Sequence, residues 1–169
     1  YGLILLGDIG LGEYRDDSVL LAAKVIGSGD FGPDARRMDI IGIPICTNER
    51  HEVDLAGDVV NIMRQPESAG ALLYVDNGGS GHTVTKLIER QDVQVNRIDW
   101  GRPCFRKEYQ QRFFNQRACG NVRMRDAILQ GRVRWSAPVD KRTRSKVIDQ
   151  LARLPFHFSE SGGLRYVMM

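Results

Sequence analysis

The stretch LILLGDIGLGEYRDDSVLL, residues 3–21, decides the fold. It begins with four consecutive aliphatic residues, and an unbroken apolar run of this kind predicts a central strand that is buried on both faces. The run leads through Gly7 to Asp8. An ionised carboxylate at the end of a buried strand is costly unless a cation, a partner or a proton accompanies it. Asp8 is therefore the first candidate functional residue.

The rest of the chain alternates between strand and helix patterns. Residues 18–26 and 38–45 are further apolar runs of strand character, and we expect the first of them to form a hairpin with the opening strand. Further strands are expected over residues 71–76 and 93–100. Helices are expected over residues 53–65, from residue 82, over 113–130 and over 140–154. A closing hairpin is expected over residues 156–169. Antiparallel strands followed by alternating units predict an α/β fold, a mixed β-sheet flanked by helices with a C-terminal β-hairpin.

The composition is typical of one compact domain. The 169 residues are 42% hydrophobic and 27% charged, which are ordinary globular values, and we expect a single domain over residues 1–169. No stretch approaches the ~20 apolar residues needed to span a bilayer, so we expect neither a membrane segment nor a signal peptide. Three cysteines, Cys46, Cys104 and Cys119, form neither an even disulfide set nor a paired metal-ligand pattern. We therefore expect reduced thiols in an intracellular protein and no zinc site.

Charge is distributed unevenly along the chain, although the net charge is only +3. Residues 1–96 hold 8 Lys and Arg against 15 Asp and Glu, a balance of −7, whereas residues 97–153 hold 15 against 5, a balance of +10. Aromatic residues are interleaved with the basic ones in this second part, which is typical of surfaces that bind polyanions; the alternative is a solvated face with core aromatics. Arg outnumbers Lys there, and the planar guanidinium matches phosphate oxygens. The candidate DNA-binding residues are Arg102, Arg106, Lys107, Arg112, Arg117, Arg123 and Arg125.

A second acid repeats the arrangement of the first. The strand expected over residues 71–76 ends in Asp76, just as the opening strand ends in Asp8. When two such strands are neighbours in a sheet, both carboxylates lie at the same edge and face a shared cleft. Two carboxylates ~4 Å apart repel by about 4 kcal/mol at an effective dielectric near 20, so the pair favours a raised pKa or a bound divalent cation. Oxygen ligands favour Mg²⁺ or Mn²⁺, with Asp17 as an accessory acid.

A pair of metals held by such acids, ~3.5–4 Å apart, would activate water and stabilise the leaving oxygen of a phosphodiester. Each acid alone also has a structural interpretation, because Asp8 precedes a glycine turn and Asp76 precedes an Asn-Gly-Gly sequence typical of an Asx turn. His82 is expected as a helix cap or surface residue, although it could face the cleft. The stretch around Ser80 lacks the nucleophile-elbow pattern, and no P-loop motif occurs. The two acids beside a basic half therefore favour phosphodiester hydrolysis.

Four stretches of the chain resemble the nuclease domain of the large terminase subunit of tailed bacteriophages, which has a ribonuclease-H-like fold. Residues 7–20 resemble the family's first acidic strand, in which an Asp is followed by a glycine turn and by another Asp before Ser or Thr, here Asp8 and Asp17. Residues 74–88 resemble the family's second acidic strand and the glycine-rich entry to its helix. Residues 100–135 resemble a segment in which an Asn-x-Arg precedes a helix that ends in Gly and a short strand. Residues 147–169 resemble the family's Gln-Leu helix and the hairpin that follows it.

The resemblance implies a function in the packaging of viral DNA. In this family an ATPase domain translocates the genome into a procapsid, and the nuclease cuts concatemeric double-stranded DNA with Mg²⁺ or Mn²⁺ by two-metal hydrolysis. Asp8 and Asp76 then correspond to catalytic metal ligands, and a third catalytic acid is expected on a helix beyond Met169, so the second ion depends on that helix. The ATPase half is expected outside residues 1–169. The implied partners are double-stranded DNA, the ATPase domain, the small terminase subunit and the portal, in the host cytoplasm.

Two other function classes fit parts of the sequence. Actin-like ATPases also place Asp-x-Gly turns on two strands, and residues 75–84 resemble their second phosphate loop, but that fold needs two such domains and 169 residues supply about one. A non-catalytic module would use the basic half to bind DNA or to dock on a portal, with the acids as turn residues. Cleavage of DNA that depends on a divalent ion separates these interpretations.

Overall fold

The computed structural model describes residues 2–10, 17–27, 35–145, 157–159 and 165–167. Contacts between residues divide the chain into two compact units. Unit 1 comprises residues 1–99 and 132–137, and unit 2 comprises residues 100–131 and 138–169. The two candidate acids thus belong to unit 1, and the candidate DNA-binding residues belong to unit 2. The single nuclease domain expected over the whole chain stays a prediction.

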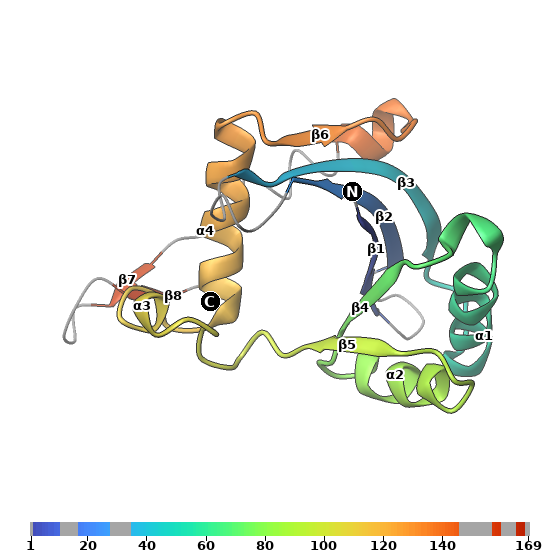
Figure 1. Cartoon of the computed structure of the whole chain (residues 1–169). Helices are drawn as coiled ribbons and strands as arrows, with labels where there is room; N and C mark the ends of the chain where they lie inside the picture. The colour runs from blue at the N-terminus through green and yellow to red at the C-terminus, as the bar shows by residue number, and fades with distance from the viewer. Residues whose placement is uncertain (1, 11–16, 28–34, 146–156, 160–164, 168–169) are drawn as a thin grey trace. The chain divides into compact units, whose positions relative to one another are not determined.

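Unit 1 is built on a mixed sheet, in which the described strands have the order β5-β4-β1-β2-β3-β6 (Figure 1). The strand β1 (Gly2–Asp8) pairs antiparallel with β2 (Ser18–Ile26), which pairs antiparallel with β3 (Arg37–Thr47). Parallel pairing joins β1 to β4 (Leu72–Asp76), β4 to β5 (Val95–Ile98), and β3 to β6 (Val133–Trp135). The predicted α/β fold, a mixed sheet with the opening hairpin inside it, is confirmed.

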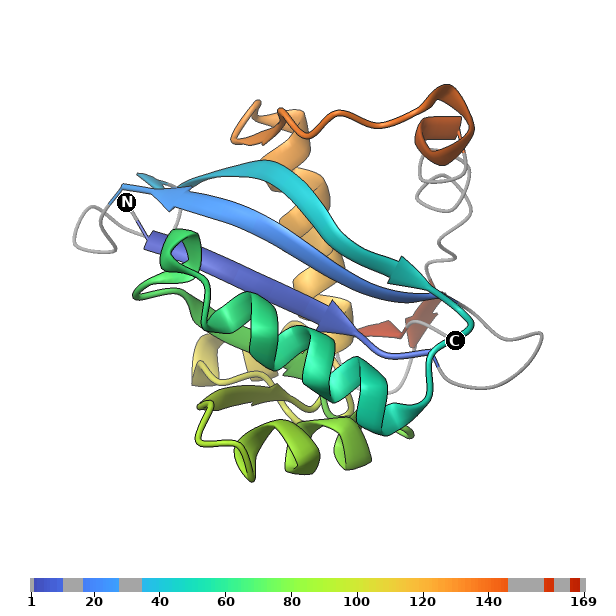
Figure 2. The ribbon, with the colours of Figure 1, turned by 90° about the vertical axis from the view of Figure 1, so that its right-hand side faces the viewer.

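Two helices cover the same face of this sheet (Figure 2). The helix α1 (Glu52–Met63) buries Leu55 and Val59, and α2 (Gly81–Glu89) buries Val84 and Ile88. On each helix these residues recur at helical spacing, so each helix presents an apolar stripe that packs against the strands. The predictions of helices over residues 53–65 and from residue 82 are confirmed.

The strand β1 is fully buried on only one face. Leu5 is 2% exposed and packs in the core that α1 and α2 close, whereas Ile4 and Leu6, which alternate with it along the strand and face the other side, are half-buried. The expectation of burial on both faces is therefore wrong for the second face, because both described helices of unit 1 lie on the first. A smaller cluster around Ala23, Ile40 and Ala137 packs with Ile4 instead.

Unit 2 contains the helices α3 (Lys107–Gln110) and α4 (Gln116–Leu129) and the antiparallel strands β7 (His157–Ser159) and β8 (Arg165–Val167). The helix α4 begins after Asn115, whose Oδ1 accepts a hydrogen bond from the Ala118 backbone N–H at 2.9 Å. A separate core fixes this unit, formed by Cys104, Phe113, Ala118, Cys119 and Val122. The paired strands β7 and β8 confirm the predicted C-terminal hairpin.

Several elements differ from the expectation in their bounds. The helix predicted over residues 113–130 begins at Gln116 because Asn115 caps it. The short strand β6 was expected only from the family resemblance, and α3 and the 3₁₀ turn η3 (Pro66–Ser68) were not expected. Of the helix predicted over residues 140–154, residues 141–145 are helical and 146–154 lie outside the described residues. Among the described helices none is long and apolar enough to cross a membrane.

Candidate active site

The acids at positions 8 and 76 end two neighbouring strands. Gly7 pairs with Val75 in the parallel register of β1 and β4, so Asp8 and Asp76 occupy the next position on each strand. Both stand at the carboxyl ends of their strands, and paired strands lie about 4.8 Å apart. Asp8 is exposed and Asp76 is half-buried. The fold thus brings these two residues to one edge of the sheet, as the sequence predicts for neighbouring strands.

Asp17 lies at the same edge. It directly precedes β2, and Asp8 pairs with Val19 in the antiparallel register of β1 and β2. The buried Ser18 hydroxyl donates a hydrogen bond to the Gly10 carbonyl at 2.5 Å, which ties the residues after β1 to the start of β2. Asp17 is therefore two positions along the chain from Val19, the register partner of Asp8, and its accessory role stays a prediction.

The Gly-rich segment after Asp76 explains how its carboxylate is oriented. The Gly78 backbone N–H donates to Asp76 Oδ1 at 2.9 Å, which is the Asx turn expected as the structural interpretation. Only one carboxylate oxygen takes part in this bond, so the turn and a ligand role are compatible. The helix α2 then begins in very close contact with the strand, because a Cβ at Gly81 would lie 1.9 Å from the Asp76 carbonyl oxygen.

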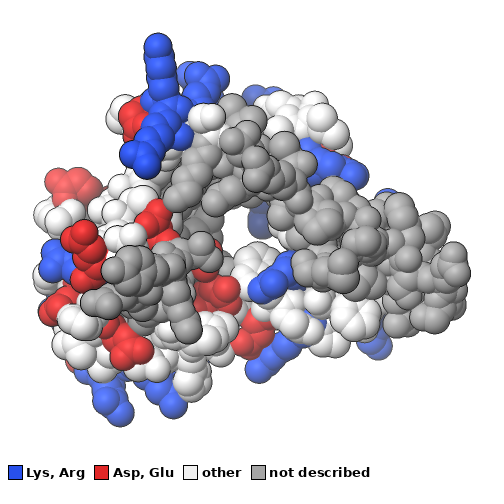
Figure 3. All heavy atoms as spheres, turned by 180° about the vertical axis from the view of Figure 1, so that it is seen from behind, with Lys and Arg blue, Asp and Glu red and all other residues white. Residues whose placement is uncertain are grey.

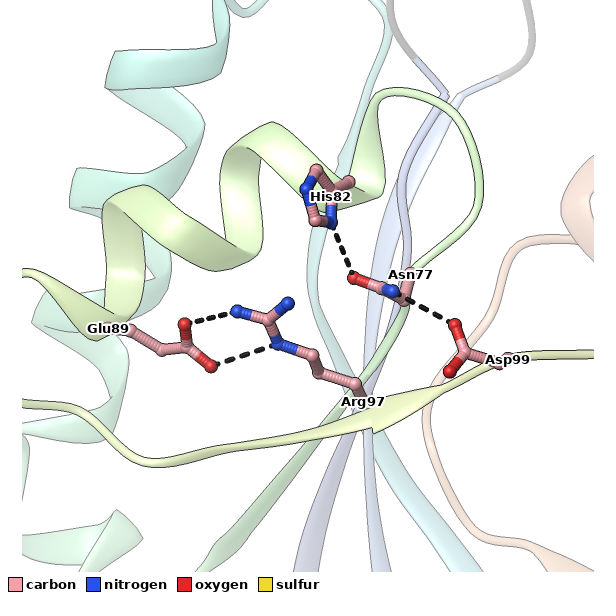
Figure 4. A network of polar contacts seen from close by, with 5 residues as sticks. All are labelled: Asn77, His82, Glu89, Arg97 and Asp99. Carbon is pink, nitrogen blue, oxygen red and sulfur yellow. Dashed lines mark hydrogen bonds and ion pairs between the residues drawn. The ribbon is translucent and has the colours of Figure 1, made fainter.

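A hydrogen-bond network continues from the residue after Asp76 (Figure 4). The Asn77 backbone N–H donates to the Ile98 carbonyl at 2.9 Å, and Asn77 Nδ2 donates to Asp99 Oδ1 at 2.9 Å. His82 Nδ1 lies 3.2 Å from Asn77 Oδ1. A carboxylate only accepts hydrogen bonds, so Asp99 fixes the orientation of the Asn77 amide. A carbonyl oxygen only accepts as well, so His82 Nδ1 is the donor in its contact with Asn77 Oδ1.

Asp99 is a site residue that sequence reasoning missed. The strand was predicted over residues 93–100, which placed this acid inside it, whereas β5 ends at Ile98. Asp76 pairs with Ile98, so Asp99 follows β5 at the edge where Asp76 ends β4. The available signal was a third predicted strand with an acid near its carboxyl end. His82 itself is the second residue of α2 and is exposed, which agrees with the surface position expected for it.

An ion pair fixes the other end of α2. Arg97 of β5 binds Glu89 through two hydrogen bonds, from Nε at 3.1 Å and from Nη2 at shorter range (Figure 4). These hydrogen bonds lower the pKa of Glu89 below its ordinary value and raise that of Arg97 above its own. The pair connects α2 to β5, so it supports the position of the helix whose first turn contacts Asp76.

The donor chemistry of this edge suits a hard divalent cation. Asp8, Asp17 and Asp76 offer only carboxylate oxygens, which Mg²⁺ and Mn²⁺ prefer. Among the described residues, however, no three His, Cys, Asp or Glu side chains come close enough together to hold a metal ion. Two carboxylates on adjacent strands therefore form the core of the candidate centre, and further ligands have to come from water, DNA or other residues.

The candidate DNA-binding residues all lie on a short stretch of unit 2. Of these seven, Arg123 is half-buried and the other six are exposed. Arg123 Nη1 donates to the Tyr109 hydroxyl at 2.6 Å, and its guanidinium carbon lies 5.1 Å from the Tyr109 ring centroid. This side chain thus also stabilises unit 2. Arg106 and Arg125 form ion pairs with Glu108 and Asp126 at 3.4 and 2.8 Å.

The acidic part of the charge pattern lies on unit 1. Figure 3 shows one face of the molecule, on which acidic side chains gather over the part of unit 1 that carries α1 and α2. Glu52, Asp54 and Asp58 of α1 belong to this part. Such a surface repels a polyanion, so contacts with nucleic acid are more favourable on the basic stretch of unit 2.

The chain is similar in sequence to a curated phage protein. It is 24% identical over 163 residues to a probable terminase large subunit of Enterobacteria phage P7, and the match covers 96% of this chain. The chain spans only 31% of that relative's length. No family model matches the chain.

The fold is shared with solved structures of low sequence identity. Two of them are crystal structures of the large terminase nuclease from thermophilic phage G20c, one with bound magnesium. Each has a TM-score of 0.53 and 16% identity and covers 99% of this chain, and the match covers 71% and 70% of the respective solved chain. The resemblance inferred from the sequence is thus confirmed: the chain is similar to part of a phage large terminase subunit and shares the α/β fold of a solved terminase nuclease.

Proposed function

We propose that the chain is a divalent-metal-dependent endonuclease that cuts concatemeric double-stranded viral DNA during genome packaging. The observation that carries this proposal is the position of Asp8 and Asp76 at the ends of adjacent parallel strands. The similarity to a terminase large subunit and to a terminase nuclease structure with bound magnesium supports it. The acids alone would also suit a turn, but Asp76 uses only one carboxylate oxygen in its turn.

The acidic residues of unit 1 have different roles at the proposed site. Asp8 and Asp76 are the metal ligands, and Asp17 is the accessory acid. The Gly78 N–H holds Asp76 Oδ1 and leaves Oδ2 available as a ligand atom. When bound, Mg²⁺ or Mn²⁺ supplies an activated water and stabilises the leaving oxygen of the phosphodiester. A second ion requires a further acid in addition to these residues.

The residues of unit 2 bind the substrate. Guanidinium groups contact phosphate oxygens without reading bases, so we expect little sequence preference. The partners proposed by analogy with terminase large subunits are an ATPase domain, the small terminase subunit and the portal, in the host cytoplasm.

The proposal is tested by incubating supercoiled plasmid with the chain in Mn²⁺, Mg²⁺ or EDTA. We expect nicked and linear products with either ion and none in EDTA, and Asp8→Asn or Asp76→Asn should abolish cleavage without a change in thermal midpoint. Asp92→Asn is the matched control, because this exposed residue has a φ of +60°, which Asn adopts as readily as Asp. Unchanged cleavage in either site variant would remove the assignment. Binding of DNA without metal-dependent cleavage would instead indicate a non-catalytic module.

A further inference from the structure

The loop over residues 105–114 of unit 2 is closed at its base by hydrogen bonds. Gln116 takes part in two of them: its backbone N–H donates to the Arg102 carbonyl at 2.8 Å and its Nε2 donates to the Pro103 carbonyl at 3.2 Å. Cys104 Sγ lies 3.4 Å from the Asn115 carbonyl, to which it donates. The residues just before the loop are thus held against the residues just after it. We call residues 105–114 the basic loop.

The first and last residues of the basic loop are exposed phenylalanines. Phe105 is 88% exposed and Phe114 is 56% exposed. They directly follow Cys104 and precede Asn115, which are joined by the hydrogen bond at the base. The two rings therefore start from neighbouring points of the backbone. Within three positions of them in sequence lie five exposed cationic residues: Arg102, Arg106, Lys107, Arg112 and Arg117.

The interior of the loop is fixed, which makes the exposure of the two rings a property of the fold. Tyr109 and Phe113 meet edge to face with ring centroids 6.1 Å apart, and Phe113 is buried. The guanidinium carbons of Arg106 and Arg123 lie 6.0 and 5.1 Å from the Tyr109 ring centroid. The guanidinium carbon of Arg112 lies 5.5 Å from the Phe113 ring centroid. Gln110 Nε2 also donates to the Cys104 carbonyl at 2.7 Å. Phe105 and Phe114 are therefore exposed on a segment whose conformation these contacts fix.

The charge around the loop selects the class of ligand. Residues 100–131 hold seven Lys and Arg against two Asp and Glu, a balance of +5. Exposed aromatic rings among arginines suit a ligand that has both phosphates and flat apolar faces. A base offers such a face only when it is unpaired, because in an intact duplex the faces are stacked on neighbouring base pairs. Nucleic acid with unpaired bases matches both features.

We propose that the basic loop binds unpaired bases of DNA by stacking them on Phe105 and Phe114, while the adjacent arginines contact the phosphates. This deepens the proposed function, on which its biological role rests, by naming locally melted or single-stranded DNA as the form that the nuclease engages. The binding itself requires no metal and no cleavage. It can therefore be tested separately from the active site.

The test is fluorescence anisotropy of the whole chain with a labelled single-stranded oligonucleotide and with a blunt duplex of the same length, in EDTA. We expect Phe105→Leu and Phe114→Leu each to weaken single-strand binding roughly tenfold, while duplex binding stays within about twofold. Phe105→Trp should retain or improve single-strand binding, because indole stacks at least as well. Leu129→Ala is the matched control, since Leu129 is a 77% exposed apolar residue of the same unit.

Three outcomes overturn the proposal. One is a single-strand affinity that changes no more in the Leu variants than in the Leu129→Ala control. Another is an equal loss of affinity for single strand and duplex, and the third is weaker single-strand binding by Phe105→Trp than by the parent chain. If DNA binding is unaffected in every variant, the exposed rings belong to a protein-docking surface instead. The Asp8→Asn variant separates this proposal from the proposed nuclease function. It should lose plasmid cleavage but keep its affinity for single-stranded DNA.

Discussion

Asn77 donates a hydrogen bond from Nδ2 to Asp99 Oδ1 at 2.9 Å, and this bond ties the residue that follows β4 to the residue that follows β5. Asn77 is the neighbour of Asp76 in sequence, so the bond fixes the backbone that carries a proposed metal ligand. Its other side-chain contact, to His82, connects the same residue to the first turn of α2. Asp99 is thus a positioning residue for the candidate centre.

We expect Asp99→Leu to lower metal-dependent nicking roughly tenfold or more, because removal of a partner that orients a ligand segment typically costs 10–100-fold in metal affinity or activity. Asp99→Asn should retain most of the activity, since its side-chain carbonyl still accepts from Asn77. The measurement is the Mn²⁺ concentration that gives half-maximal nicking, with thermal midpoints recorded for both variants. Equal loss in Leu and Asn variants would assign the effect to charge and not to the hydrogen bond.

Gly81→Ala should destabilise unit 1 and weaken the site together. A Cβ at this position would lie 1.9 Å from the Asp76 carbonyl oxygen, so α2 or the end of β4 has to move, at a cost of about 1–3 kcal/mol. Gly57→Ala is the matched control, because it lies in α1 with nothing within 4 Å of its Cβ position. That change should stabilise the fold by roughly 0.5–1 kcal/mol. Urea unfolding measures both, and a neutral Gly81→Ala would contradict the contact.

The ion pair between Glu89 and Arg97 predicts a pH dependence of stability. Hydrogen bonds from Arg97 lower the pKa of Glu89 in the folded chain, so its stabilisation is present above the ordinary glutamate value and is lost as the pH falls through the folded pKa. The Glu89→Gln variant lacks this carboxylate. Its thermal midpoint should lie below that of the parent chain at pH 7, and the difference should shrink towards pH 3. A constant difference between these pH values would contradict the assignment.

The two cysteines in the core of unit 2 should react slowly with alkylating agents. Burial and the neighbouring Cys104 raise the pKa of the Cys119 thiol to about 11, so at pH 8 roughly one molecule in a thousand carries the thiolate. Cys104 is buried as well, whereas Cys46 is exposed. Mass spectrometry after iodoacetamide treatment should find Cys46 modified first and the other two only after unfolding. Rapid modification of Cys119 in the folded chain would contradict its buried position.

Salt dependence separates phosphate contacts from other contributions to DNA binding. Each neutralised phosphate releases counterions, so affinity for duplex DNA should fall steeply with salt. Arg117→Gln should reduce the slope of log affinity against log salt by about one. Arg90→Gln is the control, since Arg90 is exposed and lies at the end of α2 in unit 1. A slope that is the same in the parent chain and in Arg117→Gln would remove this residue from the interface.

The sequence predicts the parts of the fold that depend on local pattern. The apolar runs before Asp8 and Asp76 and the helical stripes of α1 and α2 are local signals, and the structure bears them out. The three-residue strand β6 has no such signal, because it exists through pairing of Met38 with Val133 and of Ile40 with Trp135, almost a hundred residues apart. Burial of only one face of β1 likewise follows from where the helices pack.

The candidate site likewise contains residues that were predictable from the sequence and residues that were not. Acids that end apolar runs were predictable, since the carboxyl ends of parallel strands share an edge. The role of Asp99 was not, because the end of β5 is set by the register with β4, and one residue of error in that end hides the acid. The orientation of Asn77 and the tautomer of His82 depend on which atoms meet in space, and no residue pattern encodes that.

The parallel pairing of β1 with β4 joins segments that are almost seventy residues apart in the chain. Contacts of such long sequence separation form late in folding, because the closure of the intervening chain is entropically costly. Asp8 and Asp76 therefore meet only after the hairpin and the crossover through α1 are in place. If the proposed site holds, a newly synthesised chain binds the cation only once that assembly is complete, and added Mn²⁺ shifts the unfolding equilibrium towards the native state.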